Sequence, residues 1–235
     1  MPQSEQVPLA IMFDIDSTLI SVDGAGARSW AQAFRHLHDV DADIEAFTEH
    51  GMTDPEVARR TFMGVLGRPA TDREMARLLA AYLERLEEEL ARSPGYRIMP
   101  GVELLLPSLT DAGILLGLVS GNVEVAARMK LARARLNRFF PVGGYGSDSQ
   151  DRGELTRIAI ERCAVLHGHT VPPERVLVVG DTPRDVNAAH AAGAIAVGVA
   201  TGSYTIDVLR AAGAEYVLTT LETPLPGISD AIGGR

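Results

Sequence analysis

Short apolar runs that alternate with helix-like stretches are the feature that most constrains the fold of this chain. Such runs, bounded by polar or turn-forming residues, predict buried strands. The four runs span residues 8–13, 114–119, 175–179 and 194–199. Between them lie amphipathic stretches such as 183–192, which follows Thr182 as a predicted N-cap. Strands that alternate with helices predict a doubly wound α/β core, a Rossmann-like parallel sheet covered on both faces.

Residues 20–94 interrupt this alternation, and no strand is predicted among them. Thr71 to Glu74 has the capping-box pattern, and apolar residues then recur every three or four positions up to Leu90. Asp54-Pro55 opens another predicted helix. We therefore expect an inserted, all-helical cap at 20–94 and a core made of 1–19 and 95–235. The tail after Pro224 is expected to be a loose end.

Composition narrows the range of partners. Apolar residues make up 46% and charged residues 23%, which is typical of a globular protein. The net charge of −9 argues against nucleic-acid binding, which depends on basic patches. The single cysteine, Cys163, fits a reducing compartment, and the N-terminal apolar run is too short for a signal peptide or membrane span. A cytoplasmic protein without membrane partners is expected; the oligomeric state is not predicted.

Three polar clusters each follow a predicted strand directly. They are Asp14-Ile15-Asp16-Ser17-Thr18, Ser120-Gly121-Asn122 and Gly180-Asp181-Thr182-Pro183-Arg184-Asp185. In open parallel sheets, ligands bind outside the carboxyl ends of the strands. We therefore expect the three clusters to meet at one edge of the sheet, although they lie far apart in the sequence.

The residue types in these clusters predict a metal-dependent phosphate site. Asp14, Asp16 and Asp181 would bring three carboxylates together, which is costly unless a cation neutralises them. Oxygen ligands without nearby histidine or cysteine favour Mg²⁺ over Zn²⁺, and protein-bound Mg²⁺ commonly serves a phosphate. Ser120 and the backbone N–H groups around Gly121 are suited to donate hydrogen bonds to phosphate oxygens.

At this level of detail the chain resembles the haloacid dehalogenase superfamily of aspartate-nucleophile phosphohydrolases. Residues 10–18 match the first motif, hhhhDxDxT, and Ser120 matches the Ser or Thr that ends a hydrophobic strand. Residues 180–185 match GDxxxD. The helical insert after the first motif resembles a type-one cap. By overall similarity the nearest members look like phosphoglycolate phosphatases.

The resemblance implies a mechanism and a set of roles. Asp14 is the implied nucleophile that forms an aspartyl-phosphate, and Asp16 is the implied general acid and base. Mg²⁺ would be held by Asp14, the Asp16 carbonyl and Asp181, with support from Asp185. The implied phosphate-binding residues are Thr18, Ser120, Gly121, Asn122 and Arg152. The implied activity is hydrolysis of a small phosphorylated metabolite.

One departure from the family pattern concerns its usual lysine before the last motif. The substitute that we expect is Arg152, placed in a loop just before a helix, because a guanidinium can bind phosphate with two donors. Lys130 is expected to be a solvated helix residue with little effect on activity. Trp30 and Phe34 are expected to pack between helices rather than bind a ligand.

Other interpretations remain open. A phosphomutase similar to β-phosphoglucomutase would use the same aspartate but return the phosphoryl group to its substrate. A phospho-acceptor signalling module also has clustered acids and Mg²⁺, although its acceptor follows a middle strand. A dehalogenase is disfavoured because Asp16 is present. Locally, Ser120 fits a plain turn, Asn122 fits a helix N-cap, and Asp185 fits a residue that caps its own helix.

Overall fold

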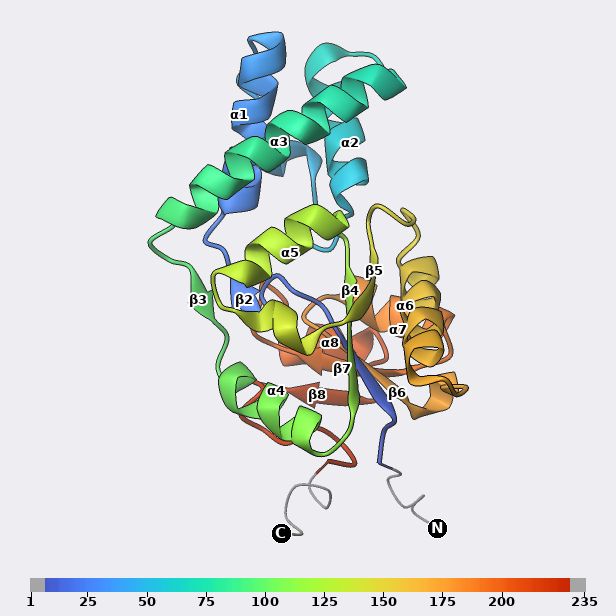
Figure 1. The fold of residues 1–235 in the computed structure, drawn as a ribbon. Helices are drawn as coiled ribbons and strands as arrows, with labels where there is room; N and C mark the ends of the chain where they lie inside the picture. The colour runs from blue at the N-terminus through green and yellow to red at the C-terminus, as the bar shows by residue number, and fades with distance from the viewer. Residues whose placement is uncertain (1–6, 229–235) are drawn as a thin grey trace.

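The computed structural model describes residues 7–228, and its centre is a six-stranded sheet (Figure 1). The strand order is β5-β4-β1-β6-β7-β8, and all neighbouring pairs are parallel. The strands are β1 (Ala10–Phe13), β4 (Leu115–Ser120), β5 (Val142–Tyr145), β6 (Val176–Gly180), β7 (Ile195–Val199) and β8 (Tyr216–Leu218). The predicted doubly wound α/β core is confirmed.

Alternation along the central strand explains why both faces of the sheet are covered. All four residues of β1 are fully buried, with Ile11 and Phe13 in one apolar cluster and Ala10 and Met12 in the other. The first cluster includes residues of α4 (Val102–Asp111) and α5 (Glu124–Ala132). The second includes residues of α6 (Arg152–His167), α7 (Pro183–Ala191) and α8 (Ile206–Ala211). Helices therefore flank the sheet on both sides.

Three helices form a separate group beyond the carboxyl ends of the strands, at the top of Figure 1. They are α1 (Ala25–His38), α2 (Asp54–Leu66) and α3 (Asp72–Arg92). The predicted capping box of Thr71 and Glu74 starts α3, and α2 begins at Asp54 as expected. Trp30 of α1 stacks on Tyr82 of α3, with ring centroids 3.9 Å apart and planes 4° from parallel.

The expectation of no strand within 20–94 is wrong at its first residues. Strand β2 (Ile20–Ser21) pairs antiparallel with β3 (Arg97–Ile98), so the chain enters and leaves the helical group side by side. Two residues are too few to give a periodic signal. Short 3₁₀ helices complete the described elements: η1 (Glu45–Phe47), η2 (Leu136–Phe139) and η3 (Pro173–Arg175).

The tail is more ordered at its start than the sequence indicates. Leu225 and Ile228 are buried and belong to the cluster that contains α4, so the chain after Pro224 is not a loose end over these residues. Its last residues, 229–235, lie outside the described part. No helix within residues 7–228 combines the length and apolar character that a membrane crossing requires.

Candidate active site

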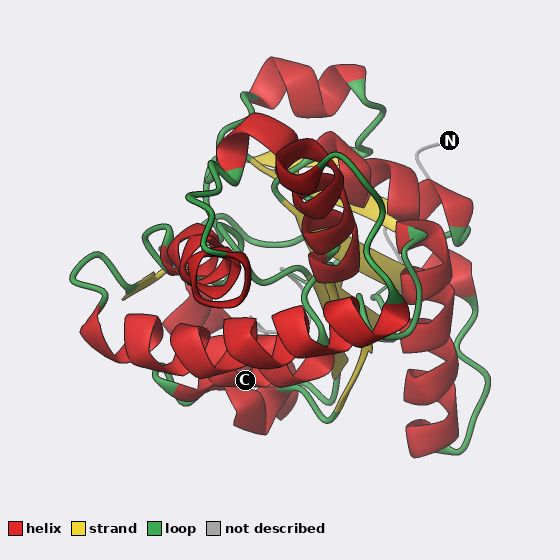
Figure 2. Cartoon of the chain, turned by 90° about the horizontal axis from the view of Figure 1, so that it is seen from above, coloured by secondary structure: helices red, strands yellow, loops and turns green. Residues whose placement is uncertain are grey.

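The three polar clusters meet at the carboxyl edge of the sheet because their strands are neighbours. Asp14 follows β1, Ser120 ends β4 and Asp181 follows β6, and β1 lies between β4 and β6. A cavity of about 470 Å³ opens there, lined by residues of the sheet edge and of the helical group. Figure 2 shows the chain from above, with helices in front of the sheet. Seven of the predicted site residues line it: Asp14, Asp16, Ser120, Gly121, Asn122, Arg152 and Asp181.

The turn after β1 aims two acids to one side. The Asp14 backbone N–H donates to the Val179 carbonyl at 2.9 Å, which extends the pairing of β1 with β6. Ile15 is fully buried in the apolar core, so Asp14 and Asp16 flank a residue that faces inward. Ser17 has a φ of 61°, in the left-handed region, and its N–H donates to the Ile20 carbonyl at 2.7 Å. This tight turn brings both carboxylates to the cavity.

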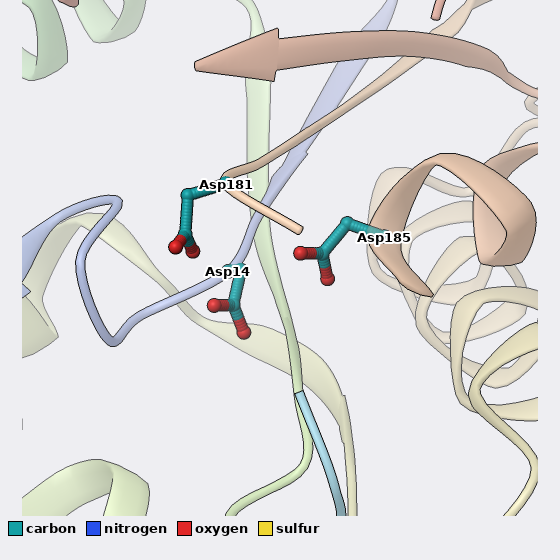
Figure 3. A group of neighbouring side chains, drawn as sticks. All are labelled: Asp14, Asp181 and Asp185. Carbon is teal, nitrogen blue, oxygen red and sulfur yellow. The ribbon is translucent and has the colours of Figure 1, made fainter. Parts of the chain in front are cut away.

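Three buried carboxylates lie within reach of one ion. Asp14, Asp181 and Asp185 each offer an oxygen within 4.8 Å of the others (Figure 3). Burial, added to the negative charge of Asp185, raises the pKa of Asp14 to about 8. Burial, with the charges of Asp14 and Asp185, likewise raises the pKa of Asp181 to about 8. Three hard oxygen donors whose ionised forms repel one another fit a divalent cation of the Mg²⁺ type.

Neighbouring residues support these acids. Thr18 is fully buried, outside the cavity lining, and its hydroxyl donates to Asp181 Oδ1 at 3.3 Å. A Cβ on Gly202 would overlap Asp181 Oδ2, so this position leaves room for the carboxylate. Asp185 is the third residue of α7 and forms a capping box with Thr182, as its local interpretation anticipated. Asp185 Oδ2 accepts from the Thr182 N–H and hydroxyl, and Oδ1 pairs with the Arg152 guanidinium.

Arg152 is brought to the site, although it is the first residue of α6 rather than part of the preceding loop. Asp151 is the N-cap of α6, and this position points Arg152 toward the acids. The Arg152 guanidinium pairs with Asp185 and lies 3.4 Å from Asp14 Oδ1, measured from Nη2. Its Nη1 donates to the Gly51 carbonyl at 3.2 Å, and its Nε has no partner in the described part.

The loop after β4 is held by its own side chains. The Asn122 amide donates to Ser120 Oγ and to Asp16 Oδ2, both at 2.8 Å. The N-cap of α5 is Val123, so the interpretation of Asn122 as an N-cap is wrong. Gly121 is required by a close approach, since a Cβ there would lie 2.4 Å from the Met52 carbonyl oxygen. The loop thus supports Asp16 and contacts the helical group at the same time.

The prediction that Lys130 is a solvated helix residue is wrong. Its side chain is 6% exposed, and Nζ lies 2.7 Å from Asp16 Oδ2. It shares the buried face of α5 with Ala126 and Ala127, which lie four and three residues before it. That helical spacing was the sequence signal for burial, but the usual exposure of lysine outweighed it.

Sequence reasoning also missed a buried acid in the helical group. Asp54 begins α2 and lines the cavity with Trp30 and Tyr82, whose side chains lie near its carboxylate. The Val123 N–H donates to Asp54 Oδ2 at 2.8 Å, and the Asp54 N–H donates to the Gly121 carbonyl at 2.8 Å. Burial raises the pKa of Asp54 to about 6, and the positive charge of Lys130 opposes the rise. Trp30 therefore packs between helices as expected and also lines the site.

Known proteins resemble this chain over most of its length. The phosphoglycolate phosphatase of Synechococcus elongatus is 29% identical over 212 residues, which cover 90% of this chain and 92% of the relative. That of Pseudomonas putida is 27% identical over 232 residues, which cover 97% and 82%. Among solved structures, CbbY from Rhodobacter sphaeroides in complex with phosphate has a TM-score of 0.74 at 23% identity, covering 92% of this chain and 95% of that one, which shows a common fold.

A sequence model describes the family that these similarities indicate. The model of the haloacid dehalogenase-like hydrolases matches residues 8–193, a span that includes all three polar clusters, Arg152 and the helical group. Because this match covers well over half of the chain, the protein belongs to the haloacid dehalogenase-like hydrolases.

Proposed function

We propose that this protein hydrolyses small phosphate monoesters with Asp14 as the nucleophile. The observation that carries the proposal is the meeting of Asp14, Asp181 and Asp185 within 4.8 Å, beside the Arg152 guanidinium, at the base of a cavity. At about 470 Å³ the cavity is in the range of small-molecule sites. The phosphoglycolate phosphatases among its relatives make phosphoglycolate the first substrate to test.

The residues around Asp14 would bind the phosphoryl group. Ser120 and Gly121 line the cavity with Asp14, and the Ser120 hydroxyl and the Gly121 N–H would donate to phosphoryl oxygens. Arg152 would add positive charge at Asp14, so that the anionic ester approaches a less repulsive site. When bound by Asp14, Asp181, Asp185 and the Asp16 carbonyl, Mg²⁺ would neutralise charge on the transferred group.

Asp16 would act first as the general acid and then as the general base. Asp14 Oδ attacks phosphorus while the bond to the ester oxygen breaks, and Asp16 gives its proton to that oxygen. Water then attacks the aspartyl-phosphate, loses a proton to Asp16, and releases phosphate and the Asp14 carboxylate. The helical group roofs the cavity with Trp30, Tyr82 and Asp54, and would limit access of bulk water during the first step.

The decisive experiment is a screen for phosphate release in the presence of Mg²⁺. Phosphoglycolate, sugar phosphates and nucleotides are offered to the purified protein, and Asp14→Asn is compared with it. Turnover should fall by several orders of magnitude in Asp14→Asn, whereas Asp207→Asn, at an exposed position, should behave as the parent. Equal turnover in Asp14→Asn would refute the proposal. Isomerised sugar phosphate without free phosphate would identify a phosphomutase instead.

A further inference from the structure

Lysine is used at one position only in this chain. Of the 22 lysine and arginine residues, 21 are arginine, and the exception is Lys130. This one ammonium is buried on α5 and lines the candidate active site. An ammonium is a compact point charge, whereas a guanidinium is a broad planar fork. The Lys130 ammonium, the more compact of the two kinds of cation, therefore lies in the enclosed space beside Asp16.

Neighbouring elements fix the Lys130 ammonium in place. The Tyr96 hydroxyl donates to the Lys130 carbonyl at 2.6 Å, which anchors the backbone of this turn of α5. Helix α1 closes the space beyond Nζ at Gly26, where a Cβ would lie 3.9 Å from Nζ. Asp54 lies near enough for the Lys130 charge to act on its carboxylate. Lys130 is thus held between an acid of the sheet edge and an acid of the helical group.

The contact with Asp16 is selective for one oxygen. Lys130 Nζ and Asn122 Nδ2 both donate to Asp16 Oδ2, at 2.7 and 2.8 Å. Asp16 Oδ1 is buried and has no hydrogen-bond partner in the part of the chain that the structure describes. Two donors on one oxygen stop rotation of the carboxylate. The two donors therefore fix how the Asp16 carboxylate is oriented at the edge of the cavity.

We propose that Lys130 is a positioning residue that, with Asn122, holds the Asp16 carboxylate in the orientation from which it exchanges protons with substrate and water. This inference rests on the proposed function. Asp16 gives its proton to the ester oxygen as the P–O bond breaks, and it regains a proton from the water that attacks the aspartyl-phosphate. Lys130 acts only through its contact with Asp16 and does not touch the reacting atoms.

The first test uses esters that differ in their need for a proton donor. An alkyl phosphate has a poor leaving group, whereas 4-nitrophenyl phosphate releases a stable anion that needs little protonation. Lys130→Met should lower kcat/KM for the alkyl ester about 100-fold or more, in the range of general acid catalysis, and for the nitrophenyl ester about tenfold or less. Asn122→Ala should show the same bias, and Lys130→Arg should recover part of the loss.

The control is Arg59→Met, which removes an exposed cation on α2 and should leave both esters unaffected. Equal losses on the two esters in Lys130→Met would overturn the proposal, because a general structural defect lowers both alike. Undiminished hydrolysis of the alkyl ester would overturn it as well.

A second measurement does not depend on turnover or on a folded Lys130 variant. Protein grown with ¹⁵N-lysine has one lysine side-chain resonance, since Lys130 is the sole lysine. We expect a slowly exchanging ammonium whose resonance shifts in Asp16→Asn. A rapidly exchanging signal at the position of a free lysine, unchanged in Asp16→Asn, would overturn the Lys130–Asp16 contact. If the parent hydrolyses neither ester, the proposed function fails, and this resonance still decides the contact.

Discussion

Addition of Mg²⁺ to the metal-free protein should release protons, because the acids that would bind it are held partly neutral. The pKa values of Asp14 and Asp181 are both raised to about 8, in each case mainly by burial. At pH 7 acids with pKa values raised this far are largely protonated, and because they interact they titrate as a pair that holds between one and two protons. Ligation requires their ionised forms. One ion should therefore displace between one and two protons.

Two observables follow from this linkage. Titration calorimetry at pH 7, in buffers of different ionisation enthalpy, should give between about one and two protons released per ion. The apparent affinity should fall by roughly tenfold to 100-fold when the pH is lowered from 7 to 6. Asp181→Asn should bind more weakly and release about one proton fewer, whereas the exposed control Asp207→Asn should match the parent. Binding at pH 7 without proton release would refute the reasoning.

The same shifts fix the sign of the pH dependence of stability. Because the pKa values of Asp14 and Asp181 in the folded protein are raised above the ordinary 3.8, the folded state binds more protons than the unfolded state between about pH 4 and pH 8. Without metal, the free energy of unfolding should fall as the pH rises through this window, by up to about 1.4 kcal/mol per pH unit for each group. Urea unfolding at pH 5 and 7, with EDTA or with Mg²⁺, measures the trend; a metal-free protein that becomes more stable toward pH 7 would contradict it.

Two further substitutions test the packing around the site. Arg152→Met leaves the buried carboxylates of Asp185 and Asp14 without their cation and should lower the free energy of unfolding by about 3–5 kcal/mol in metal-free buffer, with partial recovery in Mg²⁺; equal stability of variant and parent in urea would contradict the pairing. Trp30→Ala removes the stack on Tyr82 and should cost about 3–5 kcal/mol in the same assay. A loss below about 1 kcal/mol would mean that the stack contributes little.

Strands with a strong apolar signal could be predicted from the sequence, and weaker ones could not. β1, β4, β6 and β7 are runs of large apolar residues, each within a residue or two of its predicted bounds. β5 contains Gly143 and Gly144, which remove that signal. Gly144 is needed because a Cβ there would overlap the Leu155 backbone of α6. Gly144 is thus required by a contact with another element, and local sequence patterns do not reveal such contacts.

The residues of the candidate site could likewise be predicted from the sequence only in part. The acids that follow β1 and β6 could be placed at one edge from the order of strands and helices alone. Lys130 could not, because its burial depends on Asp16, which is 114 residues away in the sequence. Asp54 was recognised as the start of a helix, and its hydrogen bonds to Gly121 and Val123 arise only when the helical group meets the sheet edge. Paired buried charges are the exceptions to rules of exposure.

The small β2–β3 ladder has a consequence for how such a chain can change. Ser21 pairs with Arg97, 76 residues later in the sequence, and Ile20 pairs with Ile98, 78 residues later. The start and the end of the helical insert are therefore immediate neighbours. An inserted segment that leaves and re-enters the core at two paired strands places no strain on the sheet, whatever its length or sequence. Insertions, deletions or replacement of the segment between Val22 and Tyr96 would therefore reshape the part of the cavity that the helical group lines. The register of β1 with its neighbours would stay unchanged. Substrate selectivity can therefore change, by evolution or by design, while the acids that follow β1 and β6 keep their positions.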